Sequence, residues 1–149
     1  MTELALSGRI DGLAHHYPLR VYFAETDAAG IVYHAAYLDF AERARTEMMR
    51  LLGFNHARLM TDEGLVFAVR NCTLDFRRPA YLDDLLVVVS ALVYLGGATL
   101  GVRQTVWRDE VRLADIAIRL ACVRKDGGPA RVPAALRDLL KTYLTQDMD

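Results

Sequence analysis

The stretch Val21–Gly53, VYFAETDAAGIVYHAAYLDFAERARTEMMRLLG, decides the fold of this chain. Its pattern predicts a strand that ends at Phe23, a loop that carries Asp27 and Gly30, and then a long helix. Gly53 supplies the stop signal of that helix. At about 100° of turn per residue, the apolar side chains of the helix share one arc of about half of its circumference: Tyr37, Leu38, Phe40, Ala41, Ala44, Met48, Met49, Leu51 and Leu52. So wide an apolar arc predicts a helix that is enveloped by a sheet.

One charged residue, Arg45, lies inside this apolar arc. Glu42 precedes it by one turn, so the two side chains are neighbours on the helix surface. We therefore expect Arg45 to be buried and to pair with Glu42.

The chain after the helix has the pattern of an antiparallel meander. Apolar and polar residues alternate with a period of two, and turn signals interrupt the alternation at regular intervals. The predicted strands are Leu65–Phe76, Leu85–Leu95, Ala98–Arg108 and Val111–Arg124. Shorter helices are predicted at His56–Thr61, with Asn55 as its cap, and around Leu136–Leu144. The expected fold class is therefore α+β, with one long helix and a sheet of about five strands.

The strand Leu65–Phe76 carries apolar side chains on both of its faces. Val66, Ala68 and Cys72 lie on one side, whereas Phe67 and Val69 lie on the other. An edge strand this apolar is an aggregation hazard unless another chain pairs with it. We therefore expect a homo-oligomer.

The composition predicts a single domain, residues 1–149, with a core of its own. Its net charge of −1 and scattered basic residues predict no nucleic-acid partner. Residues 1–16 lack a continuous apolar run, so we expect a loosely ordered N-terminal segment that ends in an exposed His15-His16 pair, no signal peptide and no membrane span. A cytoplasmic protein is expected, with Cys72 and Cys122 as reduced core residues.

Several chemistries lack the residues that they need. The two serines, Ser7 and Ser90, lie outside any nucleophile-elbow motif, which argues against a serine hydrolase. Glycine-rich nucleotide motifs are absent, and the four histidines do not have zinc-site spacing. We therefore expect no metal and no cofactor.

The loop Glu25–Gly30 remains as the candidate site. It places the Asp27 carboxylate just ahead of free N–H groups at the start of a helix, where a developing oxyanion could be held. Gly30 would let a substrate approach the backbone. This arrangement suits acyl transfer, with Asp27 activating water or attacking directly. The alternative is that Asp27 only closes a turn or caps the helix, and that His34 is a packed or capping residue.

The sequence strongly resembles the hotdog-fold thioesterases of the 4-hydroxybenzoyl-CoA thioesterase type, and within them the acyl-CoA thioesterases associated with the bacterial Tol-Pal cluster. The resemblance covers about residues 18–136. It is carried by Thr26-Asp27-Ala28-Ala29-Gly30-Ile31-Val32-Tyr33-His34, Tyr37-Leu38, Glu42-Arg43-Ala44-Arg45-Thr46-Glu47, Phe67-Ala68-Val69-Arg70, Pro79-Ala80, Asp83-Asp84 and Pro133.

The resemblance implies a hotdog fold, in which a curved antiparallel sheet wraps a central helix, and roles for the matching residues. Asp27 would be the catalytic carboxylate, as nucleophile or general base. The backbone N–H of His34 would polarise the thioester carbonyl. Four of the matching residues would contact the substrate: Gly30, Tyr33, Val69 and Arg70. The acyl pocket would lie at the interface of a homodimer or within a homotetramer.

The implied function is hydrolysis of an acyl-CoA thioester to free acid and coenzyme A. One alternative is a thioesterase that acts on acyl-carrier protein, and another is a non-catalytic module that binds acyl-CoA or carrier protein. A hotdog hydratase would need a short D-x-N-x-x-H pattern. Asp27 and His34 lie too far apart for that pattern, and no Asn lies between them, so this reaction ranks well below hydrolysis.

Overall fold

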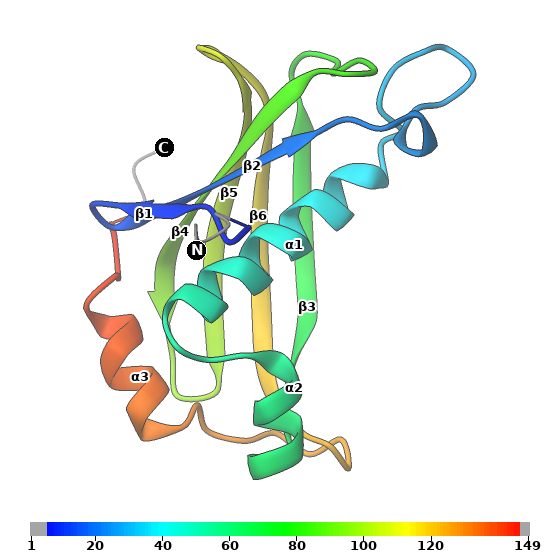
Figure 1. Ribbon diagram of the computed structural model, residues 1–149. Helices are drawn as coiled ribbons and strands as arrows, with labels where there is room; N and C mark the ends of the chain where they lie inside the picture. The colour runs from blue at the N-terminus through cyan, green and yellow to red at the C-terminus, as the bar shows by residue number, and fades with distance from the viewer. Residues whose placement is uncertain (1–5, 147–149) are drawn as a thin grey trace, which may run out of the picture.

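A computed structural model describes residues 6–146 of the chain. One antiparallel sheet of six strands curves around a central helix, α1 (Figure 1). The strands are β1 (Arg9–Asp11), β2 (Ala14–Arg20), β3 (Leu65–Phe76), β4 (Leu85–Leu95), β5 (Thr99–Arg108) and β6 (Val111–Arg124), in the order β1-β2-β4-β5-β6-β3. The helices are α1 (Ala36–Leu51), α2 (His56–Arg58) and α3 (Ala134–Lys141). A 3₁₀ turn at Phe23–Glu25 and a π-type turn at Leu59–Glu63 complete the elements. The α+β fold class is thereby confirmed.

The meander has the strands that the alternation predicts. β3, β4 and β6 begin and end at the predicted residues, and β5 begins one residue later, at Thr99. The prediction holds here because Gly and Asp turn residues bound each strand, and because the alternation matches burial on the helix-facing side. In β4, for example, Leu86, Val88 and Ser90 are buried, whereas the residues between them are more exposed.

The first strand was predicted with the wrong end, because β2 stops at Arg20 rather than at Phe23. The alternation continues to Phe23, yet that side chain is 79% exposed. The Glu25 carboxylate accepts the backbone N–H of Tyr22 at 2.7 Å, and this contact turns the chain out of the sheet into the 3₁₀ turn.

Residues 9–16 lie in strands or in the turn between them, where a loosely ordered segment was predicted. Residues 1–5 of this segment lie outside the described part, but β1 pairs with β2 and adds a sixth strand to the expected five. The His15-His16 pair was expected at a frayed end. Instead, His15 is fully buried in β2, where its Nε2 donates to the Ser7 carbonyl at 2.6 Å. Its Nδ1 is buried without a partner among the described residues.

Helix α1 buries the arc that the sequence predicts. It packs on β2 and β4, and its buried residues are Ala36, Tyr37, Phe40, Ala41, Ala44, Met48 and Met49. Leu38 and Leu51, at the borders of the arc, stay exposed. Gly53 follows the helix with φ of 90°, the left-handed conformation expected of a C′ glycine.

Arg45 is partly buried as expected, but its predicted partner was wrong. Its Nη1 donates to Oε1 of the fully buried Gln104 on β5 at 2.9 Å, rather than to Glu42. The cause is the burial of the guanidinium on the sheet side of the helix, whereas Glu42 is exposed.

Strand β3 lies at one edge of the sheet, and β1 lies at the other. The side chains of β3 are half-buried or exposed along its whole length.

Helix α2 follows α1 and is capped by Asn55, whose Oδ1 accepts the Arg58 N–H at 2.8 Å, as predicted. Within residues 6–146 the helices are too short or too polar to cross a membrane.

The buried His15 predicts a pH-dependent stability. Burial lowers the pKa of His15 below its ordinary value of 6.5, and the nearby His16 adds to this effect, whereas the Ser7 carbonyl and Glu47 oppose it. Below pH 6.5 the unfolded chain therefore binds a proton that the folded chain excludes, so the free energy of unfolding should fall as the pH falls from 6.5. Urea denaturation between pH 8 and pH 5 measures this loss.

The matched variants are His15→Gln and His16→Gln. Glutamine at position 15 still donates to Ser7 but does not titrate, so this variant should lose less stability on acidification than the wild type. His16→Gln should keep most of the dependence, because His16 is only half-buried. Equal slopes for the wild type and His15→Gln would contradict the prediction.

Candidate active site

The loop between β2 and α1 is held by a dense set of backbone hydrogen bonds. Asp27 and Ile31 are joined by a bond from the Asp27 N–H to the Ile31 carbonyl at 2.9 Å. Gly30 adopts φ of 82° and donates to the Asp27 carbonyl at 3.0 Å. The loop is tied to the sheet connection by Val32, which donates to the Ala80 carbonyl at 2.8 Å. These bonds fix a tight turn that projects beyond the start of α1 (Figure 1).

Asp27 is exposed on this turn, and only one of its carboxylate oxygens is used by the fold. Oδ1 accepts the Ala29 N–H at 2.8 Å. Oδ2 has no hydrogen-bond partner among the described residues. The turn-forming role that the sequence offered as an alternative is therefore real, and it orients the carboxylate while leaving one oxygen available.

The residues ahead of α1 present free backbone donors. Tyr33 donates its N–H to the Glu25 carbonyl at 2.8 Å. The next N–H, that of His34, has no acceptor in residues 6–146. The Tyr33 and His34 rings lie against each other, with 4.3 Å between their centroids, and both side chains are exposed. His34 directly precedes Ala35, the N-cap residue of α1, so its unpaired N–H lies just ahead of the helix and can bind an incoming oxygen.

Two separate hollows lie on this side of the molecule. A shallow one of about 530 Å³ is lined by Phe23, Thr26, Asp27, Ala28, Gly30 and Leu82. A deeper one of about 490 Å³, here called the helix–β3 cavity, lies between α1 and the β3 half of the sheet. No described residue lines both hollows. Within one chain the candidate carboxylate therefore lies apart from the helix–β3 cavity.

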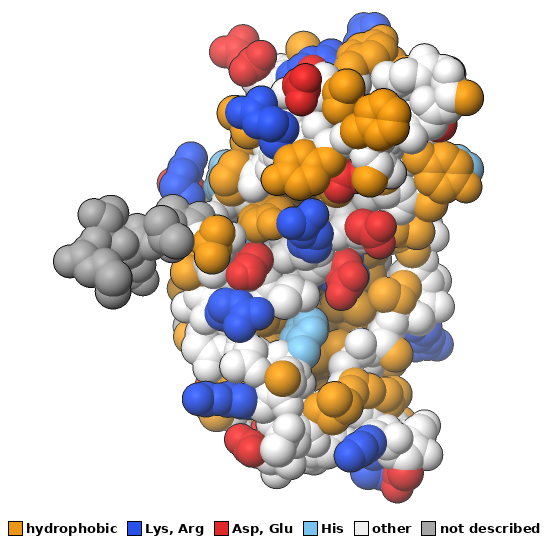
Figure 2. Space-filling model, turned by 45° about the vertical axis from the view of Figure 1, so that its right-hand side comes forward, with side chains coloured by type: hydrophobic (Ala, Val, Ile, Leu, Met, Phe, Trp, Pro, Cys, Tyr) orange, Lys and Arg blue, Asp and Glu red, His pale blue; other side chains and the backbone are white. Residues whose placement is uncertain are grey.

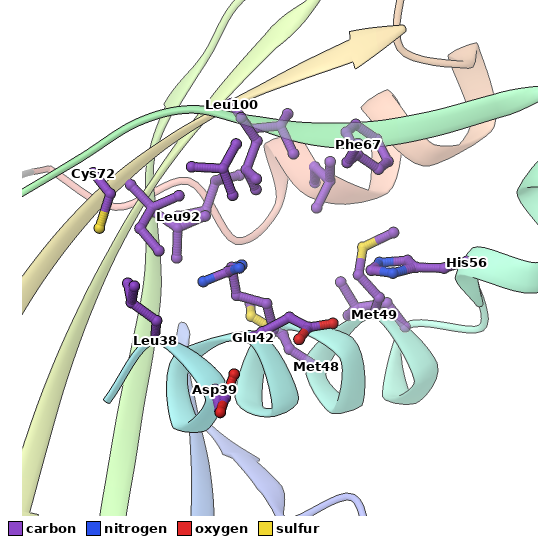
Figure 3. Close-up of a pocket in the computed structure, with 17 residues that line it drawn as sticks. Leu38, Asp39, Glu42, Met48, Met49, His56, Phe67, Cys72, Leu92 and Leu100 are labelled. Carbon is purple, nitrogen blue, oxygen red and sulfur yellow. The ribbon is translucent and has the colours of Figure 1, made fainter. Parts of the chain in front are cut away.

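The helix–β3 cavity has mostly apolar walls and a polar rim (Figures 2 and 3). Its apolar lining comes from α1, the sheet and α3: Leu38, Met48, Met49, Leu52, Phe67, Val69, Leu92, Leu100, Val102, Ile118, Leu120 and Leu140. Figure 3 shows Cys72 directed into it from β3 and His56 reaching toward it from α2. Asp39, Glu42 and Arg45 complete the lining.

Two of these positions could not be recognised as cavity residues from the sequence. Cys72 was expected in the core, yet it is half-buried on the cavity wall. His56 was expected on the surface, and it is exposed, but it also lines the cavity and lies 6.5 Å from the Phe67 ring. Burial lowers the pKa of His56, opposed by Glu42. Neither residue lies in a recognisable motif. The cavity is assembled from elements far apart in the sequence, so its lining forms no contiguous pattern.

The structure divides the predicted site residues into two groups. Asp27, Gly30, Tyr33 and His34 lie in or beside the loop. Val69 is 54% exposed and lines the helix–β3 cavity instead. Arg70 is exposed and occupies the bulge of β3, where the pairing with β6 shifts between Val69 and Asn71.

Comparison with known proteins identifies relatives. Residues 29–114 match the family described as the thioesterase superfamily. The acyl-CoA thioesterase YbgC of Haemophilus influenzae is 42% identical over 107 residues, which cover 72% of this chain and 79% of that protein. The acyl-CoA thioester hydrolase YbgC of Escherichia coli is 41% identical over 108 residues, 72% of this chain and 80% of the relative. A probable thioesterase from Bartonella henselae has a crystal structure that superposes with a TM-score of 0.78 at 39% identity, covering 80% of this chain and 99% of that one.

Proposed function

Because the chain belongs to the thioesterase superfamily, we propose that it hydrolyses acyl-CoA thioesters to a free acid and coenzyme A. The observation that carries this proposal is the Asp27 loop, which lies in a chain 42% identical to an acyl-CoA thioesterase over 107 residues. Two of the relatives named above are an acyl-CoA thioesterase and an acyl-CoA thioester hydrolase by name, and the third is a probable thioesterase. The proposal is supported by the exposed Asp27 carboxylate and the unpaired His34 N–H, which are the two kinds of group that thioester hydrolysis would use.

In the proposed reaction, Asp27 uses its free oxygen. It either takes a proton from water as the water attacks the thioester carbonyl, or attacks that carbon itself. In both routes the carbonyl oxygen becomes an oxyanion, and the carbon–sulfur bond then breaks as the thiolate of coenzyme A leaves. In the base route the proton on Asp27 passes to the leaving thiolate, and the acid is already formed. In the nucleophilic route a water molecule then cleaves the acyl–Asp27 anhydride, which releases the acid and restores the carboxylate. The exposed turn allows water to reach Asp27.

The oxyanion would be stabilised by the His34 N–H. This donor is unpaired among the described residues and lies at the entry to a helix of 16 residues, where the helix dipole favours negative charge. The imidazole of His34 has no assigned chemical role in this proposal. Tyr33 and Gly30 shape the approach to the carbonyl.

We infer that the complete site needs two chains. The Phe76 end of β3 lies beside the start of α1, since the rings of Phe76 and Tyr37 are 5.3 Å apart. The Phe67 end lies beside His56 and the helix–β3 cavity. Two copies related by a two-fold axis would pair their β3 edges in antiparallel fashion. The Phe76 end of one copy, together with its Asp27 loop, would then lie next to the cavity of the other.

This arrangement accounts for three features at once. It satisfies the unpaired edge of β3, covers apolar side chains such as Val69, and brings an acyl cavity to a carboxylate that lies outside it. Val69 would contact the acyl group at the interface. Arg70, in the bulge near the middle of β3, would lie close to the two-fold axis and to the substrate.

Substitution of Asp27 tests the chemistry. Asp27→Asn keeps an oxygen that can accept the Ala29 N–H, so the turn should survive while the negative charge is lost. We expect kcat on a good acyl-CoA to fall by about 10²–10⁴-fold with little change in KM. Release of free coenzyme A, followed with a thiol reagent, measures the rate, and Asp62→Asn is the control because Asp62 is exposed and lines neither hollow.

Substitution of His34 tests the oxyanion role. His34→Ala retains the backbone N–H, so kcat should drop by about tenfold or less. A loss on the order of 10³-fold would assign the chemistry to the imidazole instead. A folded Asp27→Asn protein with near wild-type kcat would exclude the Asp27 mechanism. Binding of acyl-CoA without release of coenzyme A by the wild type would indicate a binding module, and release only from acyl-carrier protein would identify that carrier as the substrate.

Mixed dimers test whether the two halves of the site come from different chains. Asp27→Asn inactivates the loop, and Cys72→Trp fills the helix–β3 cavity from its β3 wall. Each homodimer should be nearly inactive. A heterodimer isolated with two affinity tags should recover about half of the wild-type activity, because one of its two sites combines an intact loop with an intact cavity.

A site built within one chain gives a different result. Each site of the heterodimer would then carry one defect, and its activity would not exceed that of the parent homodimers. Sizing with light scattering supplies the companion measurement. A wild-type protein that runs as a monomer at micromolar concentration while retaining full activity would contradict the two-chain site.

A further inference from the structure

The helix–β3 cavity contains a cation among its apolar walls. Arg45 projects from the middle of α1 and lines the cavity together with Leu92, Val102 and Ile118. An arginine in such surroundings is costly, because its N–H groups leave water without finding equivalent partners in hydrocarbon. Its presence on the wall of an acyl cavity therefore calls for an acceptor.

One of its donors is fixed by a buried polar chain. Arg45 Nη1 donates to Gln104 Oε1, and Gln104 Nε2 donates to both the Ala41 carbonyl and Ser90 Oγ, each at 2.9 Å. Arg45 can only donate and the Ala41 carbonyl can only accept, so the orientation of the Gln104 amide is determined. Gln104 and Ser90 are fully buried. The guanidinium is thereby held in place from behind.

The other donors of Arg45 remain available. A guanidinium carries five N–H groups, and the bond to Gln104 is its one hydrogen bond among the described residues. Glu42 lines the same cavity one turn earlier on the helix and is exposed at the rim (Figure 3). Burial lowers the pKa of Arg45, and the charge of Glu42 opposes this shift. A guanidinium stays charged in a protein, so Arg45 places a cation with N–H groups to spare on the wall of a space that a ligand can fill.

We propose that Arg45 is a specificity-determining residue that reads a hydroxyl oxygen on the acyl group of the substrate. This inference rests on the proposed function and adds a substrate class to it. A purely hydrocarbon acyl group would seal the cavity and leave the free donors of Arg45 without water or an acceptor. A hydroxyl group accepts from Arg45 and can donate to an acceptor at the rim.

The acidic rim distinguishes a hydroxyl from a carboxylate. Asp39 and Glu42 both line the cavity, so an acyl group that ends in a carboxylate would bring a third negative charge beside them. A neutral hydroxyl avoids this repulsion. The cavity of about 490 Å³ is of the size that holds a small or medium acyl group.

The test compares acyl-CoA pairs that differ by one hydroxyl, in both aliphatic and aromatic series. For at least one pair, the wild type should show a kcat/KM about 10-fold or more higher for the hydroxylated member, as expected where a site has a buried donor to satisfy. Arg45→Met keeps the length and bulk of the side chain but removes the donors. It should reduce the preference to about threefold or less, mainly through loss on the hydroxylated member.

Arg43→Met is the matched control, since Arg43 lies on the exposed face of the same helix and lines neither hollow. It should keep the wild-type preference. Arg45→Lys retains the charge with fewer donors and should give an intermediate ratio. This variant decides the matter if Arg45→Met fails to fold.

The outcomes separate this inference from the proposed function. A wild type that hydrolyses acyl-CoAs without preferring any hydroxylated member would overturn the role of Arg45. So would an Arg45→Met variant that loses both members of each pair equally, because Arg45 would then serve the fold or the subunit contact. If the wild type hydrolyses none of the thioesters, the proposed function fails. The preference is then measured by calorimetry with non-hydrolysable thioether analogues of the same pairs, and equal affinities would overturn it.

Discussion

The structure depends on how α1 buries its apolar face. A helix of 16 residues covers only part of a six-stranded sheet, and α1 lies against β2 and β4 at one side. The Phe76 end of β3 contacts α1 through Tyr37, whereas farther along β3 the helix–β3 cavity lies between the helix and the sheet. The exposed edge of β3 borders that cavity. The position of α1 on the sheet thus leaves a space for a ligand beside a strand whose edge needs a partner.

The polar chain from Arg45 through Gln104 to Ser90 crosses the same core. Each buried member has a hydrogen-bond partner, so the chain satisfies its own groups while the outer donors of Arg45 stay free. Replacing a buried charged group such as the Arg45 guanidinium with a hydrocarbon side chain often stabilises a protein, so stability alone does not account for it. The retention of a cation next to a ligand-sized space is better explained by recognition than by packing.

Much of the fold could be predicted because local signals agree with the tertiary structure. β3, β4 and β6 have the predicted bounds because alternation, turns and burial coincide there. The end of β2 could not be predicted, since the alternation runs on to Phe23 and only the contact between Glu25 and Tyr22 turns the chain away. Burial of His15 depends on the pairing of β1 with β2, for which so short a strand gives little signal.

The candidate site was predictable only in its contiguous part. Asp27, Gly30 and His34 lie within one loop, so their spacing in the sequence already describes their neighbourhood in space. The cavity is different, because α1, α2, α3 and the sheet each contribute a few side chains. Nothing local distinguishes Cys72 or His56 from ordinary strand and helix residues. The partner of Arg45 was likewise hidden, because Gln104 is 59 residues away along the chain.

In the proposed dimer, solubility and catalysis both depend on the pairing of β3, because the Asp27 loop and the helix–β3 cavity lie apart within one chain. An exposed apolar edge strand favours uncontrolled association, and a closed two-fold pairing removes that edge. The same pairing would place each Asp27 loop at the cavity of the other chain. A change in β3 that prevents the pairing would therefore expose the edge and disconnect the carboxylate from the acyl group together. In such a protein the pairing of β3 would both limit aggregation and assemble the site. Selection on either property therefore acts on the same twelve residues of β3.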